Sequence, residues 1–177
     1  LPAMSDAPLR GHGGHAWFWE PGDERLIYPL HKLVDMYCRS VGHNSTLILG
    51  LTPDDRGLLP DADVERLTAF GEEIRGKFGK PLAQTEQAQS GDVFELELPN
   101  ARGFDLVVIQ EDIRYGERVR SYELQIRVDD AWQTIGSGSC IGHKRIHRFA
   151  KPHKGDALRL MISESVDTPN VRQFSVY

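Results

Sequence analysis

The sequence predicts an α/β segment over residues 1–82 and an antiparallel β-sandwich over residues 91–177, joined by a linker at 83–90. Residues 24–80 are ordered as helix, strand and helix, which is the repeating order of an α/β barrel or a doubly wound sheet. Beyond the linker the apolar period changes to two, in short runs bounded by Gly, Pro, Asn and Asp, as in sandwiches and jelly rolls. The linker itself is polar and has no period.

The first predicted helix follows a proline-rich and glycine-rich stretch, residues 1–23, which we expect to be a loop. Because proline is tolerated in the first helical turn but not later, the regular helix should begin near Pro29, and Gly42 is a suitable stop. Its expected apolar face, at spacings of three and four, is Leu26, Leu30, Leu33, Val34, Tyr37 and Val41.

A strand and a second helix complete the first part. The run Asn44–Leu51 is almost continuously apolar, which suits a parallel strand buried on both faces. After the turn at 52–57, Asp61 is a plausible N-cap for a helix. The expected apolar stripe of that helix is Val64, Leu67, Phe70, Ile74 and Phe78.

Seven runs with alternating or apolar character supply the strands of the predicted sandwich. They cover residues 94–98, 104–112, 120–128, 131–138, 143–150, 157–165 and 171–177. The run at 143–150 opens a basic cluster, residues 143–154, which is more typical of a solvated strand face than of a phosphate-binding surface.

Composition excludes several partners. The formal net charge is −5 and the pI is about 5.8, which does not favour a nucleic-acid partner. There is no apolar run of membrane-spanning length. Cys38 and Cys140 lack metal-ligand spacing, so we expect no metal and no cofactor. The chain begins on leucine without a secretory pattern, which indicates a piece of a longer protein and leaves the compartment open.

One aromatic and acidic stretch stands out as a candidate site. Trp17, Phe18 and Trp19 precede Glu20 and a Pro-Gly turn. Such a segment is either a loop pinned by aromatic packing or one wall of a sugar site, and at least one of the three rings should be a packing anchor. Glu20 is accordingly a surface carboxylate or a site residue.

Nearby polar residues have two interpretations each. Arg10 either binds sugar hydroxyls or pins the loop to Asp6. His15, set among glycines, reaches a substrate or is an exposed loop histidine. Asp54, in the turn that follows the predicted strand, is more typical of a turn carboxylate than of a catalytic one.

The pattern L-V-x-x-Y-x-x-S-V-G-x-N-x-x-L-x-L-G-x-x-P-x-x-x-G-x-x-P-x-x-D across Leu33–Asp63 resembles the bacterial α-L-fucosidases of glycoside hydrolase family 29. Together with the stretch around Trp17–Glu24, it extends the resemblance over residues 1–82. These residues are similar to the C-terminal part of the catalytic domain, so the resemblance implies the last βα units of a (β/α)8 barrel. Residues 91–177 match only the habit of these enzymes to carry a β-sandwich, jelly-roll-like, after the barrel.

The resemblance implies a retaining hydrolase of terminal α-L-fucosyl linkages that uses two carboxyl groups. Many relatives have glutamate where this chain has Met4, and that glutamate is often the acid/base. Glu20 is then the best candidate for the acid, with Asp6 next, and the flanking aromatics are expected to raise the pKa of Glu20 by desolvation. Trp17, Trp19, Arg10 and His15 would bind substrate. The nucleophile would lie upstream, outside this chain.

The resemblance implies two partners. One is a fucosylated glycan, and the other is either the missing N-terminal barrel half or a complementary chain. Without the latter, the first part should expose apolar faces and self-associate. The alternative function is a catalytically silent fucosidase-like chain, or a carbohydrate-binding or scaffold module.

Overall fold

The computed structural model describes residues 3–14, 17–85, 87–99 and 103–177. The chain divides into two compact units. The N-terminal unit takes the residues up to 41 and residues 45–79, and the C-terminal unit takes residues 42–44 and 80–177.

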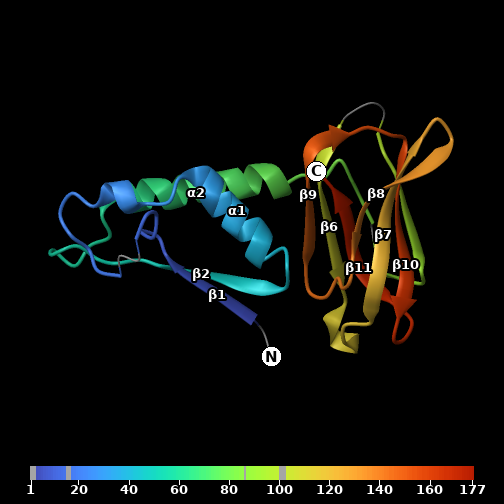
Figure 1. Cartoon of the computed structure of the whole chain (residues 1–177), viewed down its shortest axis with the longest axis horizontal. Helices are drawn as coiled ribbons and strands as arrows, with labels where there is room; N and C mark the ends of the chain where they lie inside the picture. Colours follow the sequence, from blue (N-terminus) through green and yellow to red (C-terminus); the bar gives the residue numbers. More distant parts are fainter. Residues whose placement is uncertain (1–2, 15–16, 86, 100–102) are drawn as a thin grey trace. The chain divides into compact units, whose positions relative to one another are not determined.

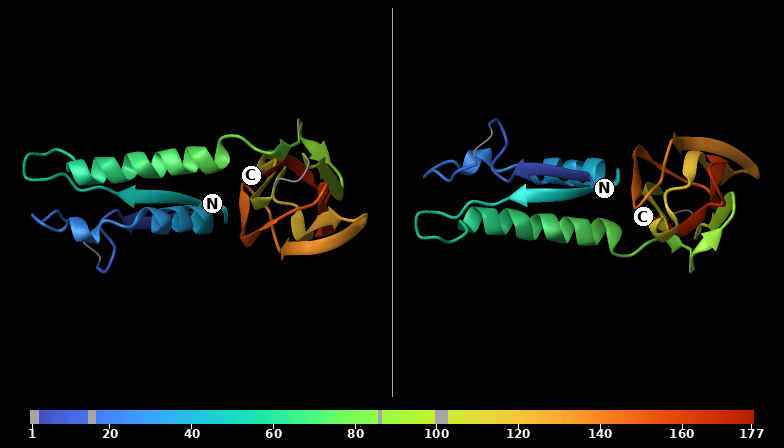
Figure 2. Two further views of the ribbon diagram at one scale, coloured as in Figure 1. Left: turned by 90° about the horizontal axis from the view of Figure 1, so that it is seen from above. Right: turned by 90° about the horizontal axis from the view of Figure 1, so that it is seen from below.

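The N-terminal unit is a β–α–β–α arrangement. Its elements are β1 (Ala3–Pro8), the 3-10 turn η1 (Glu24–Leu26), α1 (Leu30–Ser40), β2 (Ser45–Gly50) and α2 (Asp61–Phe78). Strands β1 and β2 are parallel, with Ala3 opposite Ser45 and Pro8 opposite Gly50. Both helices lie on one face of this pair (Figures 1 and 2).

The helix predictions are confirmed in position, with one correction at a cap. Helix α1 begins directly after Pro29, as expected from the fixed φ of proline. Helix α2 begins at Asp61, but the N-cap is Pro60 and makes no side-chain hydrogen bond. Asp61 is instead in the first turn, where its carboxylate complements the helix dipole.

The expectation of a loop over residues 1–23 is wrong for Ala3–Pro8, which form β1. Small and polar residues with proline at the end carry no strand pattern, and the segment is a strand because β2 pairs with it. β2 itself is parallel as predicted, but it is not buried on both faces. Ile48 is 40% exposed and Met4 on β1 is 71% exposed, because no described element of the N-terminal unit covers the face away from the helices.

A small core holds the N-terminal unit together. Leu9, Ile27 and Leu33 are buried at its centre. Partly buried side chains surround them, namely Tyr28, Met36, Leu49, Ala62, Leu67 and Phe70. Val64, expected on the apolar stripe of α2, is 46% exposed instead.

The C-terminal unit consists of two antiparallel sheets. One sheet has the order β5-β10-β7-β8, and the other has β3-β11-β6-β9 with β4 also on β11. The strands are β3 (Ala83–Gln84), β4 (Gln89–Ser90), β5 (Val93–Glu97), β6 (Phe104–Glu111), β7 (Val119–Val128), β8 (Ala131–Gly138), β9 (Arg145–His153), β10 (Ala157–Ser165) and β11 (Asn170–Val176); a 3-10 turn, η2 (Ile113–Tyr115), follows β6. The seven predicted runs correspond to β5 through β11.

The two sheets share one hydrophobic core. Leu96 and Leu160 from the first sheet join Val107, Ile109 and Phe174 from the second in a single buried cluster. The stretch 83–90, expected as a linker, carries β3 and β4, which pair with β11. The boundaries proposed from the sequence for the domains remain a prediction.

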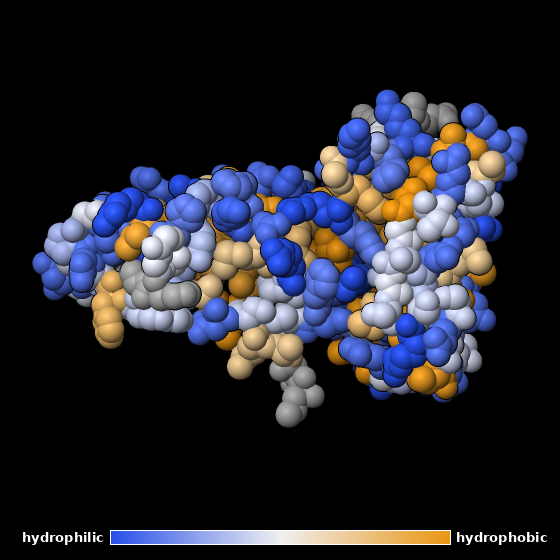
Figure 3. All heavy atoms as spheres, in the orientation of Figure 1, coloured by the Kyte–Doolittle hydropathy of each residue, from blue (hydrophilic) through white to orange (hydrophobic). Residues whose placement is uncertain are grey.

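No helix in the described part of the chain combines the length and apolar character needed to cross a membrane. Apolar atoms are nevertheless visible on the surface of the N-terminal unit in Figure 3. The exposed large apolar side chains of that unit are Met4, Trp17, Phe18, Ile48, Leu51, Leu58, Leu59 and Val64.

Candidate functional site

The candidate site lies at the carboxyl ends of β1 and β2. The two strands run parallel and end together, at Pro8 and Gly50, and the amide of Leu9 still donates to the carbonyl of Gly50 at 2.9 Å. The loops at 9–23 and 51–60 therefore leave the sheet at the same edge. In parallel α/β proteins, this edge is where ligands bind.

The aromatic stretch is attached to this edge by its first ring. A Cβ on Gly50 would lie 3.3 Å from Cζ3 of Trp17, so the indole packs against the end of β2. The hydroxyl of Thr52 donates to the carbonyl of Trp17 at 3.1 Å, which ties the two loops together. Trp17 is thus a packing anchor that remains 48% exposed, whereas Phe18 is 82% exposed and Trp19 is half-buried.

Glu20 occupies the first position of a tight turn. The amide of Asp23 donates to the carbonyl of Glu20 at 3.3 Å. Pro21 and Gly22, with φ of +83° at Gly22, supply the residues that a type II turn requires at its centre. The amide of Glu20 donates in turn to Oδ2 of Asp23 at 3.4 Å. The Glu20 side chain is exposed, so the neighbouring rings do not enclose it.

Arg10 has partners that the sequence did not indicate. Its Nη2 and Nε donate to Asp63 at 2.6 and 3.4 Å, and its Nη1 donates to Asp23. The side chain of Arg10 is only 3% exposed. The expected pairing with Asp6 is therefore wrong, and the guanidinium faces two internal carboxylates.

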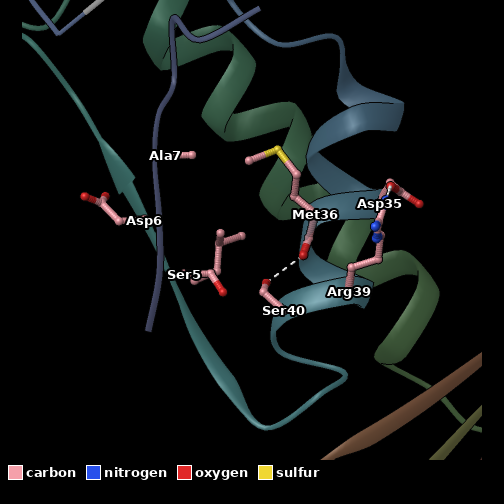
Figure 4. A pocket seen from close by; sticks show the side chains of 8 residues that line it. Ser5, Asp6, Ala7, Asp35, Met36, Arg39 and Ser40 are labelled. Atoms are coloured by element: carbon pink, nitrogen blue, oxygen red, sulfur yellow. Dashed lines mark hydrogen bonds and ion pairs between the residues drawn. The ribbon is translucent and has the colours of Figure 1, made fainter. Parts of the chain in front are cut away.

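Asp6 lies on β1 rather than on a loop. Ser5 and Ala7 point towards α1 and Asp6 points away from it, as Figure 4 shows. A pocket of about 240 Å³ between β1 and α1 is lined by Ser5, Asp6 and Ala7, with Met36 and Ser40 opposite. Asp6 is exposed on the uncovered face of β1 and β2. His15, the other candidate, falls outside the described residues.

The loop after β2 is shaped by Asp54. Its Oδ1 accepts from the amides of Arg56 and Leu58 at 2.9 and 3.1 Å, and its Oδ2 accepts from the Arg56 guanidinium. The Arg56 side chain, followed by these backbone donors, holds the pKa of Asp54 below its ordinary value. Asp54 therefore acts as a turn carboxylate.

The residues missed from the sequence are Asp23 and Asp63. Both are buried, at 7% and 0% exposure. Asp23 directly follows the Pro-Gly turn after Glu20, and Asp63 ends the pattern quoted for Leu33–Asp63, so both lie within the stretches that carry the resemblance. Their partner is 13 and 53 residues away, and sequence spacing alone does not show it.

Among the described residues, no group of three His, Cys, Asp or Glu side chains is arranged to hold a metal ion. Among the described residues of the loops at 9–23 and 51–60, Glu20 and Asp55 are exposed carboxylates, and Glu20 adjoins the aromatic stretch in sequence. Such a pairing suits a sugar, because rings pack on its apolar face and a carboxyl group acts on its oxygens.

Comparison with solved structures identifies relatives over the whole chain. A candidate α-L-fucosidase from Bacteroides thetaiotaomicron VPI-5482 superimposes with a TM-score of 0.95 and is 46% identical, over 100% of this chain and 41% of its own. A glycoside hydrolase family 29 member from an unknown rumen bacterium gives a TM-score of 0.86 and 29% identity, over 100% of this chain and 33% of its own. The whole chain is therefore similar, in sequence and in fold, to proteins of glycoside hydrolase family 29.

A curated relative agrees with this similarity. α-L-fucosidase 1 of Arabidopsis thaliana is 25% identical over 100% of this chain and 40% of its own length. No family model matches the chain. The chain spans about 40% of the length of the curated relative.

Proposed function

We propose that this chain is part of a retaining α-L-fucosidase that hydrolyses terminal α-L-fucosyl linkages of glycans. The observation that carries the proposal is the similarity of the whole chain, at 46% identity and a TM-score of 0.95, to a candidate enzyme of this kind. The tryptophan-flanked Glu20 at the carboxyl edge of a parallel strand pair supports it.

The N-terminal unit is proposed to be the closing portion of a (β/α)8 barrel, with residues 83–90 as the connection and 91–177 as a jelly-roll-like sandwich. Parallel β1 and β2, joined through α1 and followed by α2, have the order that a barrel requires. The uncovered face that carries Met4, Asp6 and Ile48 would be the inner face of that barrel. An upstream segment or a complementary chain would cover it.

Glu20 is proposed to be the general acid and base. In a retaining mechanism one carboxylate attacks the anomeric carbon, while the other protonates the leaving oxygen and later activates water. Glu20 would perform the second task, and the nucleophile would come from outside this chain. The two carboxyl groups would need to lie roughly 5–5.5 Å apart once fucose is bound.

The aromatic side chains are proposed to form the wall of the sugar site. Phe18 and the exposed part of Trp17 present apolar surface beside Glu20. Such surface fits the apolar face and the methyl group of a fucosyl residue. Trp19, Asp6 and His15 remain candidates for the same wall.

The test is fucose release from an α-L-fucoside with a poor leaving group, measured with the full-length protein. Glu20→Gln should lower kcat by roughly 10²–10⁴-fold, the usual contribution of a general acid. Glu24→Gln is the matched control, because Glu24 is an exposed carboxylate in the adjacent η1 turn and should leave kcat unchanged. Wild-type kcat in Glu20→Gln would exclude Glu20 as the acid.

A further inference from the structure

Arg10 joins three segments of the N-terminal unit at one buried point. Arg10 follows β1, Asp23 precedes η1, and Asp63 lies in the first turn of α2. The guanidinium binds Asp63 through Nε and Nη2, and it binds Asp23 through Nη1. The side chains of Arg10, Asp23 and Asp63 are 3%, 9% and 1% exposed. The loop that carries the aromatic stretch therefore has both of its ends fixed to α2.

The same point is linked directly to Glu20. The Asp23 carboxylate that binds Arg10 also accepts the amide of Glu20, at 3.4 Å. The amide of Asp23 closes the Glu20–Asp23 turn at 3.3 Å. Two backbone contacts beside this point, Tyr28 to Leu9 at 3.0 Å and His12 to Leu26 at 2.8 Å, hold the loop ends together. Arg10 thus determines where the backbone of Glu20 lies.

The charges of the three side chains favour this arrangement. One buried cation lies between two buried carboxylates, and the α2 N-terminus adds positive potential at Asp63. Removal of the cation would leave two desolvated carboxylates facing one another, which is strongly unfavourable. A lysine cannot fully replace Arg10, because its ammonium group lacks the planar guanidinium that binds Asp63 through two nitrogens.

We propose that Arg10 is a positioning residue for the Glu20 carboxylate rather than a ligand of the sugar. This inference rests on the proposed function, in which Glu20 is the general acid. A displacement of a catalytic group by about 1 Å can lower a rate by about 10²-fold. The loss should be confined to the proton transfer that Glu20 performs.

The experiment compares two aryl α-L-fucosides in the full-length protein, one with a poor and one with a good leaving group. Only the poor leaving group depends on a general acid. Arg10→Met should lower kcat/KM, which reports formation of the fucosyl-enzyme, by about 10²-fold on the poor substrate and by less than about threefold on the good substrate, with Arg10→Lys between Arg10→Met and wild type. In a Glu20→Gln background, Arg10→Met should cause no further loss on the poor substrate.

Two results would overturn the inference. An equal loss of kcat/KM on both substrates would mean that Arg10 supports the fold in general, and an equal loss that comes from a rise in KM alone would mean that it binds the sugar. Arg25→Met is the matched control, because Arg25 is an exposed arginine of η1, and it should leave both substrates unaffected. Asp23→Asn, which keeps the shape of the side chain, should reproduce the effect of Arg10→Met if the latter folds poorly.

Amide hydrogen exchange on this chain separates this inference from the assignment of Glu20. Arg10→Met should speed exchange at Glu20 and Asp23 by at least about tenfold, because their two hydrogen bonds define the turn. Unchanged exchange would overturn the positioning role whatever Glu20 does. Faster exchange in Arg10→Met together with full activity of Glu20→Gln would instead exclude Glu20 as the general acid. The role of Arg10 in positioning the turn would still be established.

Discussion

Two buried carboxylates, Glu111 and Asp63, are held by donors from other segments of the chain. Glu111, 2% exposed at the end of β6, accepts the amides of Arg118 and Val119 at 2.8 and 3.1 Å, and that of Gly142 at 2.7 Å. Asp63 is held instead by Arg10. A buried carboxylate is stable only with such partners, since the cost of leaving it unpaired exceeds the net gain from most single contacts.

Removal of the Glu111 side chain should destabilise the C-terminal unit. Glu111→Ala leaves the buried amides of Val119 and Gly142 without acceptors, at about 1–3 kcal/mol for each. We expect the free energy of unfolding to fall by about 3 kcal/mol or more, measured by denaturant titration. Glu164→Ala, at an exposed position, should change it by less than about 0.5 kcal/mol. Equal effects of the two substitutions would contradict this role.

His147 makes stability depend on pH. Its Nε2 lies 2.7 Å from the hydroxyl of Tyr122, and burial, then Arg145 and His43, lower the pKa of His147 to about 4. The unfolded chain, with an ordinary pKa near 6.5, therefore binds more protons between about pH 6.5 and 4 than the folded chain does. Stability should consequently be lost as pH falls through this window, by up to about 1.4 kcal/mol per pH unit.

The measurement is the free energy of unfolding of wild type and His147→Gln at several pH values. The difference between the two slopes isolates the histidine, because all other titrating groups are shared. We expect the variant to lose less stability below pH 6.5. Parallel curves between pH 6.5 and 4 would show that folding does not lower the pKa of His147.

At the scale of elements, apolar period and proline position determine much of the fold. Pro29 marks the start of α1, and alternation locates β5 through β11. Strand β1 was not predictable, because Ala3–Pro8 has no alternating apolar pattern and depends on pairing with β2. The partners of Arg10 were not predictable either, since Asp23 and Asp63 meet it only after β1, η1 and α2 have packed together.

Strands β3 and β4 should contribute to the stability of the C-terminal unit. The amides of Leu82 and Thr85 donate to the carbonyls of Val176 and Phe174 at 2.7 and 2.9 Å, and Leu82 packs against the core. A fragment of residues 80–177 should therefore melt at a higher temperature than one of residues 91–177. Identical melting temperatures in a thermal unfolding experiment would show that 83–90 is a linker in energetic terms.

At the scale of the whole molecule, the N-terminal unit carries an uncovered sheet face. Met4 and Ile48 are exposed on it, at 71% and 40%, and both helices lie on the opposite face. Apolar surface of this kind normally contacts another protein segment. In the proposed function that segment is the remainder of a barrel.

The isolated chain should therefore self-associate. Sedimentation velocity should show a mass that grows with concentration, and Met4→Gln combined with Ile48→Thr should reduce it. Val166→Thr is the control, because Val166 is 65% exposed in the C-terminal unit, and it should have little effect. A sharp monomer of wild type at all concentrations would argue against an uncovered interface.

The most direct test of Glu20 as the general acid and base uses azide with the Glu20→Ala variant of the full-length protein. In a retaining enzyme that has lost only its acid and base, azide can replace water at the fucosyl-enzyme intermediate. On a substrate with a good leaving group, we expect azide to restore turnover and give fucosyl azide of retained α configuration. Inverted product, or no rescue together with wild-type activity, would contradict the assignment of Glu20 as the general acid and base.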